Sequence, residues 1–207
     1  MTLILVSTSP RRYQIFSLLN LPFLMLSPDG AEVADDGRSP TEEARFQARR
    51  KATSVAHQFP KAILIGSDTL ISLDGVTIGK PTDVADARAI LRRLRGRSHD
   101  VVTAVALVRG ERMIETLETA CVTMHDFSDT ELDTYLATGD SLDKAGAYSV
   151  QGPWQHIIAE LEGDYLAVMG LPLRAVAEGL RELGYPVAVD VEGMCRERTV
   201  LNWWRCD

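Results

Sequence analysis

The sequence predicts an α/β fold in which a mixed β-sheet is flanked by helices. Strand-like and helix-like segments alternate through the first half of the chain, which is typical of a sheet with parallel strands. Hairpins are expected in the middle of the chain, and they add antiparallel strands to that sheet. The composition is that of a globular protein, with 45% hydrophobic and 25% charged residues among 207. We therefore expect one domain over residues 1–186 and a C-terminal extension over residues 187–207.

The first third of the chain is expected to form two strands and two helices. The apolar run at residues 3–6 predicts a buried strand. Ser9 and Pro10 follow it as a favourable N-cap and first-turn pair, and the apolar residues after them are spaced for one face of a helix. Residues 21–26 predict a second strand, and residues 40–57 predict a long charged helix.

The rest of the chain is expected to form five strands and three helices. Asp74 and Gly75 form the two-residue turn of a predicted hairpin. Asp68 would then lie where a buried strand gives way to this hairpin. Ser128 and Glu131 have the spacing of a capping box at a helix start. The expected strands are 62–66, 70–73, 76–78, 101–108 and 113–124, and the expected helices are 83–94, 128–137 and 173–183.

Charge and hydropathy exclude several classes of function. The net charge of −7 argues against binding to a nucleic acid polymer, which relies on an extended basic surface. It does not exclude a nucleotide, because charges more than about 8 Å away are largely screened. No apolar run approaches the roughly 20 residues that span a bilayer. The three cysteines have no patterned spacing. We therefore expect a cytoplasmic protein with no membrane partner.

The first candidate cluster lies between a predicted strand and a predicted helix. Hydroxyl groups, free backbone N–H groups and two guanidinium groups would meet there, which suits the binding of phosphate. The alternative is a capped helix with two solvated arginines. The residues of this cluster are Ser7, Ser9, Arg11 and Arg12.

The second candidate cluster combines Asp68 and Thr69 with Lys80, across the predicted hairpin. An aspartate at the end of a strand could hold a metal ion or orient water, while a lysine neutralises phosphate. The alternative is an Asp turn with a surface lysine.

The third candidate cluster runs from Asp143 to Gly152. Gly146 lets the backbone approach a ligand closely. Lys144 offers a positive charge, and Gln151 offers the donor and acceptor that can bind the edge of a base. The alternative is a glycine-containing turn with an exposed lysine.

Other signals in the sequence are set aside. The segment from Gly75 to Lys80 is similar to a P-loop, but only three residues separate its glycines and Pro81 replaces Ser or Thr. The four histidines lack metal-ligand spacing, so no zinc site is expected. A run of arginines is expected to form the solvated face and end of a helix. Its members are Arg92, Arg93, Arg95 and Arg97.

Taken together and in this order, the three clusters resemble the Maf family, also called septum formation inhibitor proteins. The resemblance extends from Leu3 to Leu183. It implies an elongated mixed sheet with two lobes around a nucleotide-binding cleft, and in many members a homodimer. The remaining residues that carry it are Glu32, Lys51-Ala52, Ser67-Asp68-Thr69, Gly79-Lys80-Pro81, Gln151-Gly152 and Gly170-Leu171-Pro172.

The resemblance also implies an activity, which is hydrolysis of a nucleoside triphosphate between its α- and β-phosphates to a monophosphate and pyrophosphate. The cofactor would be a divalent cation, namely Mg²⁺, Mn²⁺ or Co²⁺. Asp68 would be the catalytic base and, with Glu32, would serve the metal. A glutamine after the Lys-Ala-Gly motif, such as Gln151, resembles the branch of the family that acts on dTTP and UTP. The substrate-binding residues would be Ser7, Ser9, Arg11, Arg12, Lys51, Thr69, Lys80, Lys144 and Gln151.

Two other functions remain open at this point. One is the same reaction on 7-methyl-GTP, for which the related branch carries glutamate in place of Gln151. The other is a nucleotide-binding regulator of cell division that acts by contacting a partner. Trp203 and Trp204 would offer that partner an apolar anchor.

Overall fold

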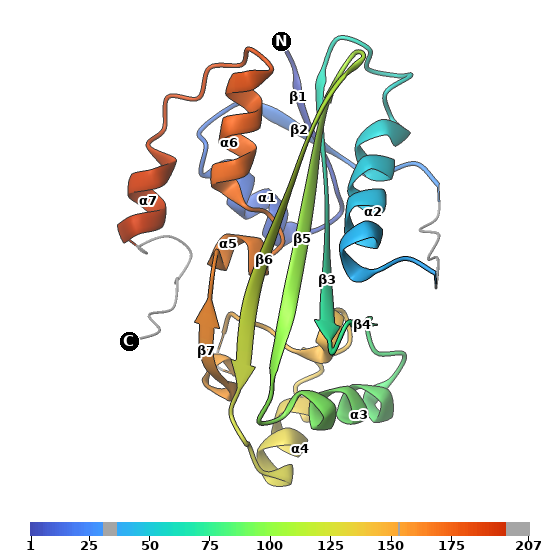
Figure 1. Cartoon of the computed structure of the whole chain (residues 1–207), viewed down its shortest axis with the longest axis vertical. Coiled ribbons are helices and arrows are strands. Elements are labelled where there is room, and N and C mark those ends of the chain that lie inside the picture. The colour runs from blue at the N-terminus through green and yellow to red at the C-terminus, as the bar shows by residue number, and fades with distance from the viewer. Residues whose placement is uncertain (31–36, 153, 198–207) are drawn as a thin grey trace.

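The computed structural model describes residues 1–30, 37–152 and 154–197. Within them, one sheet of seven strands runs along the length of the molecule (Figure 1). The strand order is β2-β1-β3-β5-β6-β7, and β4 pairs with β3 outside this order. The strands are β1 Leu3–Val6, β2 Phe23–Leu26, β3 Ile63–Leu73, β4 Val76–Ile78, β5 Ser98–Arg109, β6 Arg112–Met124 and β7 Ile158–Glu162.

The sheet is mixed, as predicted. Strand β1 pairs in parallel with β2 and with β3, whereas every other pairing is antiparallel. Seven helices cover the sheet within the described residues. They are α1 Pro10–Ser17, α2 Pro40–Ser54, α3 Val84–Leu94, α4 Asp129–Ala137, α5 Tyr165–Val168, α6 Leu173–Glu182 and α7 Val191–Glu197, with short 3-10 turns at η1 Ala145–Ala147 and η2 Gln155–Ile157.

Strand β3 corrects one sequence prediction. The sequence predicted a strand that ended before Asp68, followed by a separate hairpin, but β3 is continuous over 11 residues. Its first part pairs with β1 as far as Gly66, and its last part pairs with β4 from Ile71 onward. Residues 67–70 of β3 lie between these two pairings, past the end of β1 and before the start of β4. Asp68 therefore lies within a strand, beside the loop that follows β1.

Alternate residues of β1 and β3 pack into two separate cores on the two faces of the sheet. On one face, Leu5 and Ile65 pack with Phe16 of α1 and with residues of α5 and α6. On the other face, Val6 and Leu64 pack with α2. The connection from β1 to β2 and the connection from β2 to β3 therefore run on opposite faces. In an open α/β sheet, ligands bind at the carboxyl end of a strand where such connections diverge. Here that strand is β1.

Gly66 determines how closely α2 approaches β3. A Cβ atom at Gly66 would lie 2.3 Å from the carbonyl oxygen of Ala48 and 2.5 Å from the backbone nitrogen of Ala52. Only glycine on the strand and alanines on the helix allow the two backbones to pack at this distance. This close packing brings Lys51 of α2 to Asp68, the next residue of β3 that faces this helix.

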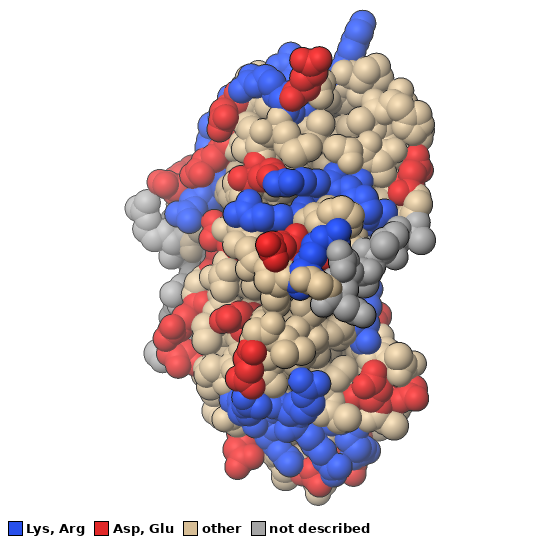
Figure 2. All heavy atoms as spheres, turned by 45° about the vertical axis from the view of Figure 1, so that its right-hand side comes forward, with Lys and Arg blue, Asp and Glu red and all other residues tan. Residues whose placement is uncertain are grey.

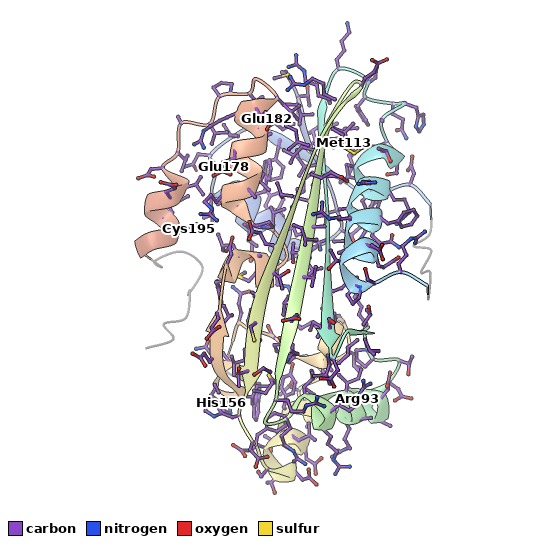
Figure 3. All side chains as sticks on the ribbon, in the orientation of Figure 1. Arg93, Met113, His156, Glu178, Glu182 and Cys195 are labelled. Carbon is purple, nitrogen blue, oxygen red and sulfur yellow. The ribbon has the colours of Figure 1, made fainter. Side chains whose placement is uncertain are left out.

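Helices gather at both ends of the long sheet, giving the two lobes that the family resemblance implied (Figure 1). One lobe contains α1, α2 and α6, and the other contains α3 and α4, with η1 packed against α3. In the first lobe, α6 turns Glu178 and Glu182 away from the sheet, while Val176 and Leu180 are buried (Figure 3). Lys and Arg side chains gather over α3 at the far end of the second lobe (Figure 2). This confirms the expected solvated arginine face.

Residues 187–197, predicted as part of an extension, pack onto the domain. Val187 and Val191 are buried in the core beside α6, and α7 packs against that helix. Trp203 and Trp204 lie outside the described residues. None of the described helices is long and apolar enough to cross a bilayer.

Several short elements were not predicted from the sequence. They are β7, α5 and α7, which contain five, four and seven residues. Segments this short give too few turns or alternations for a periodic pattern to stand out.

Candidate active site

The loop after β1 is held by its own serines. Ser9 is the N-cap of α1, and its Oγ accepts a hydrogen bond from the backbone N–H of Arg12 at 3.4 Å. Ser7 is buried, and its Oγ accepts from the backbone N–H of Ser9 at 3.1 Å. The backbone N–H of Ser7 donates to the carbonyl of Leu26 at 2.8 Å. These bonds fix the start of α1, and with it the two arginines, beside the carboxyl end of β1.

Arg12 joins α1 to two other parts of the chain. Its Nε donates to the carbonyl oxygen of Gly170 at 2.8 Å, and its Nη2 donates to Oγ1 of Thr69 at 3.2 Å. Gly170 has φ of +110°, and a Cβ atom there would lie 3.2 Å from Arg12 Nε. The guanidinium therefore lies directly over a glycine, which explains why this position suits no larger residue.

Lys51 and Asp68 form an ion pair on the opposite face of β3. Lys51 Nζ donates to Oδ1 of Asp68 at 2.6 Å, and the two residues are 6% and 8% exposed. Asp68 points toward α2, whereas its neighbours Ser67 and Thr69 point to the other face of the strand, where they contact Gly170 and Arg12. The pair places a carboxylate and an ammonium group one residue from the Arg12 contact. The sequence predicted both residues but not their pairing.

A backbone hydrogen bond joins the second cluster to the third. The N–H of Gly146 in η1 donates to the carbonyl of Gly79 at 3.1 Å. Gly146 has φ of +70°, and a Cβ atom there would lie 2.5 Å from Cδ1 of Ile71 on β3. Lys80, beside Gly79, is exposed and makes no hydrogen bond within the described parts of the chain. Its amine can therefore reach a ligand.

Lys144 is bound within its own loop. Its Nζ donates to the backbone carbonyl and to Oδ1 of Asp140 at 2.7 and 2.8 Å, and to Oδ1 of Asp143 at 2.6 Å. The hydrogen bond from Lys144 lowers the pKa of the Asp143 carboxyl, and the charge of Arg11 lowers it further. Arg11, on α1, thus faces this loop of the second lobe. The first and third clusters therefore also lie close together.

Gln151 lies at the end of the third cluster and is half-buried. Its backbone N–H donates to Oγ of Ser149 at 3.2 Å. Its side chain hydrogen-bonds to the hydroxyl of Tyr165, which offsets part of the rise that burial causes in the pKa of Tyr165, to about 12. The amide of Gln151 is thus held against α5.

The same loop is anchored to the sheet by Tyr148. Its hydroxyl lies 2.7 Å from Nε2 of His99 on β5, and both residues are buried. Burial lowers the pKa of His99 to about 4 and raises that of Tyr148. The Nδ1 atom of His99 is buried, and no partner for it exists among the residues that the structure describes. A neutral histidine therefore holds the loop in place.

Of the two predicted metal ligands, only Asp68 lies within the described residues. Glu32 lies outside the described residues. No group of three or more His, Cys, Asp or Glu residues suited to a metal occurs in ranges 1–30, 37–152 and 154–197. Asp68 offers carboxylate oxygens, and Mg²⁺ is often held by one or two carboxylates together with substrate phosphates. The chemistry of Asp68 therefore fits such an ion.

The fold and this site define a class of protein: an α/β protein that gathers hydroxyl, guanidinium and ammonium groups where a parallel strand ends, as phosphate-binding proteins do. Residues 2–183 match the family described as Maf-like protein. The chain belongs to the Maf family, which confirms the resemblance drawn from its motifs.

Curated relatives match over most of the chain. A protein of Symbiobacterium thermophilum named dTTP/UTP pyrophosphatase is 42% identical over 185 residues, which cover 89% of this chain and 95% of that protein. A protein of Dictyoglomus thermophilum with the same name is 40% identical over 186 residues, which cover 88% and 96%. Among solved structures, a HAM1 protein from Coxiella burnetii has a similar fold, with a TM-score of 0.50, 16% identity, and coverage of 88% of this chain and 100% of that one.

No role was assigned to Ser67 from the sequence, where it was named only as part of a motif, and Thr103 was not indicated, although both touch the partners of Arg12. Thr103 Oγ1 lies 2.9 Å from Thr69 Oγ1, and Ser67 Oγ lies 2.9 Å from the carbonyl oxygen of Gly170. Ser67 stood next to Asp68 in a recognised motif, which was a usable signal. Thr103 stands inside an apolar strand run, where a threonine is unremarkable.

Proposed function

We propose that this protein is a metal-dependent nucleoside triphosphate pyrophosphatase that hydrolyses dTTP and UTP to the monophosphate and pyrophosphate. One observation carries the proposal. Three clusters far apart in the sequence are linked around the end of β1, through Arg12 to Thr69 and through Gly146 to Gly79. The names of the relatives support the nucleotides and the reaction.

Phosphate binding is assigned to cations that approach from several elements. Arg11 and Arg12 come from the start of α1, Lys51 from α2 and Lys80 from the segment after β4. A triphosphate carries about four negative charges, and these must be neutralised before water can attack a phosphorus atom. Ser7 and Ser9 add hydroxyl groups at the positive end of α1, while their backbone N–H groups donate to Leu26 and to Ser7 Oγ.

Asp68 is assigned the role of general base. Its carboxylate is buried and paired with Lys51 at 2.6 Å. In the substrate complex, a phosphate oxygen would share the Lys51 ammonium and leave Asp68 able to take a proton from the water that attacks the α-phosphate, the innermost of the three. When bound, a divalent cation such as Mg²⁺, Mn²⁺ or Co²⁺ would neutralise phosphate charge and make a coordinated water more acidic.

Base selection is assigned to Gln151. An amide side chain offers a donor and an acceptor, which match the carbonyl and N–H groups on the edge of uracil or thymine. Tyr165 holds this amide in one position, so that less conformational freedom is lost when the base binds. We place the activity in the cytoplasm, because Cys121 and Cys195 are both free thiols.

A nucleotide panel tests the proposal. Purified protein is incubated with dTTP, UTP, CTP, GTP and 7-methyl-GTP in the presence of Mg²⁺, Mn²⁺ or Co²⁺, and the products are separated by ion-exchange chromatography. We expect pyrophosphate and monophosphate, fastest from dTTP and UTP, and loss of turnover with a chelator. Orthophosphate with a diphosphate product would overturn the bond assignment, and faster turnover of 7-methyl-GTP would overturn the substrate.

A further inference from the structure

A buried hydroxyl network lies behind the guanidinium of Arg12. Thr103 and Ser67 belong to neighbouring strands, and both are 0% exposed. Thr103 Oγ1 lies 2.9 Å from Thr69 Oγ1 and 2.7 Å from the carbonyl oxygen of Ala167. Ser67 Oγ lies 2.9 Å from the carbonyl oxygen of Gly170 and 3.0 Å from that of Ala104, so these two acceptors share its one proton. Arg12 bonds directly to two members of this network, Thr69 and Gly170.

Counting protons gives the network a direction. Each hydroxyl has one proton to donate. The Ala167 carbonyl can only accept, so the proton of Thr103 is best used there. Thr69 then donates to Thr103, and a lone pair of its Oγ1 is turned toward Arg12 Nη2. The chain from Arg12 to Thr69, Thr103 and Ala167 is complete only while Thr103 keeps its hydroxyl group.

We propose that Thr103 and Ser67 are positioning residues that set the orientation of Arg12 for phosphate binding. Thr103 orients the hydroxyl that Arg12 Nη2 contacts, and Ser67 holds the carbonyl that Arg12 Nε contacts. Arg12 is half-buried, and a guanidinium fixed before the substrate arrives needs no reorganisation during the reaction. This inference rests on the proposed function, because it treats Arg12 as a ligand of the triphosphate.

Thr116 on β6 supplies a matched control. Its Oγ1 is buried and, within the described residues, has no hydrogen-bond partner. It lies opposite Val105 in the same pair of strands that carries Thr103. Replacing either threonine by valine removes one buried hydroxyl and keeps the shape of the side chain. Only the change at Thr103 breaks the network.

The test is a double-mutant cycle with Arg12. We would measure kcat and KM for UTP, the Kd for pyrophosphate by calorimetry, and Tm. We expect T103V to lower kcat/KM and weaken pyrophosphate binding by about tenfold each, in line with a small misplacement of a catalytic group. T103S should restore both values, and T116V should stay within about twofold of the wild type. In an R12A background, T103V should change either value by less than about twofold, because its effect passes through Arg12.

The same loss from T103V with and without Arg12 would overturn the proposal, as would unchanged binding and turnover in T103V. If T103V does not fold, S67A replaces it, with the same expected loss and the same dependence on Arg12. Pyrophosphate binding separates the two proposals. If no nucleotide is hydrolysed, the proposed function fails, while coupling between Thr103 and Arg12 is still measured through this Kd.

Discussion

The two faces of β3 use different chemistry within three consecutive residues. On the α2 face, Asp68 pairs with Lys51, so a negative and a positive charge are buried together. On the α5 face, Thr69 Oγ1 accepts a hydrogen bond from one cation, Arg12, and Ser67 donates to the Gly170 carbonyl that Arg12 also contacts. The first face has a group that can exchange a proton, whereas the second can only orient a charge. We infer that proton transfer belongs to the α2 face, whereas phosphate is bound from both faces, by Lys51 on one and by Arg12 on the other.

The largest effect is expected from Asp68→Asn. The amide keeps the size of the side chain but cannot accept a proton, so kcat should fall by about a hundredfold or more. The control is Asp74→Asn, which removes an exposed carboxylate paired with Arg97 and should leave kcat unchanged. Circular dichroism would confirm that both variants fold. Near-normal turnover of Asp68→Asn would remove the proposed difference between the two faces.

Gly170→Ala disturbs only the α5 face. Its Cβ atom would lie 3.2 Å from Arg12 Nε and 3.3 Å from Thr69 Oγ1, at a φ of +110°. We expect a loss of about 2 kcal/mol in the free energy of unfolding, measured in urea, together with a higher KM. Gly139→Ala also places a methyl group at a positive φ, of +74°, but in open space. If both variants raise KM equally, crowding of Arg12 is not the cause.

The second lobe offers a similar comparison, between a lysine that is bound by carboxylates, Lys144, and a lysine that is exposed, Lys80. The amine of Lys144 is bound by Asp140 and Asp143, whereas that of Lys80 is exposed. Lys80→Ala should therefore raise KM by about tenfold, because it removes a charge that is available to phosphate. Lys144→Ala should mainly lower Tm, because its aspartates lose their partner. Equal increases in KM for the two variants would contradict this assignment.

The smallest effect concerns the stability of the loop anchor. The pKa of His99 is lowered from 6.5 to about 4, so the unfolded chain binds a proton between these values and the folded protein does not. The stability that the neutral histidine supports is complete above pH 6.5 and declines as the pH falls toward 4. When the pH falls from 7 to 5.5, we expect the free energy of unfolding, measured in urea, to fall by about 1 kcal/mol. His99→Gln should make the free energy of unfolding less dependent on pH, whereas His57→Gln, at an exposed position, should not. If the two variants have identical pH curves, buried His99 is not the source of the dependence.

Local chemistry in the sequence predicted one part of the site well. Ser9 and Pro10 indicated the start of α1, and the structure confirms the cap. Asp68 was named as the base, but its strand was predicted to end too early. A strand predicted from an apolar run ends where polar residues interrupt that run. Here polar Ser67, Asp68 and Thr69 stay within β3, because each side chain has a polar partner.

The rest of the site depends on distances that no sequence spacing gives. Lys51 reaches Asp68 because Gly66 and Ala48 let α2 and β3 approach closely. Arg12 reaches Gly170 across 158 positions of sequence. Contacts of this kind follow from the packing of whole elements, so motif order could indicate that the clusters meet but could not say which atoms touch.

Hydrolysis of UTP in water enriched in oxygen-18 tests the central claim most directly, because the claim assigns water attack to the innermost phosphate. Mass spectrometry of the products would locate the label. We predict that one labelled oxygen enters UMP and none enters pyrophosphate, and that Asp68→Asn slows this incorporation as much as it slows turnover. Label in pyrophosphate, or in orthophosphate, would contradict the account.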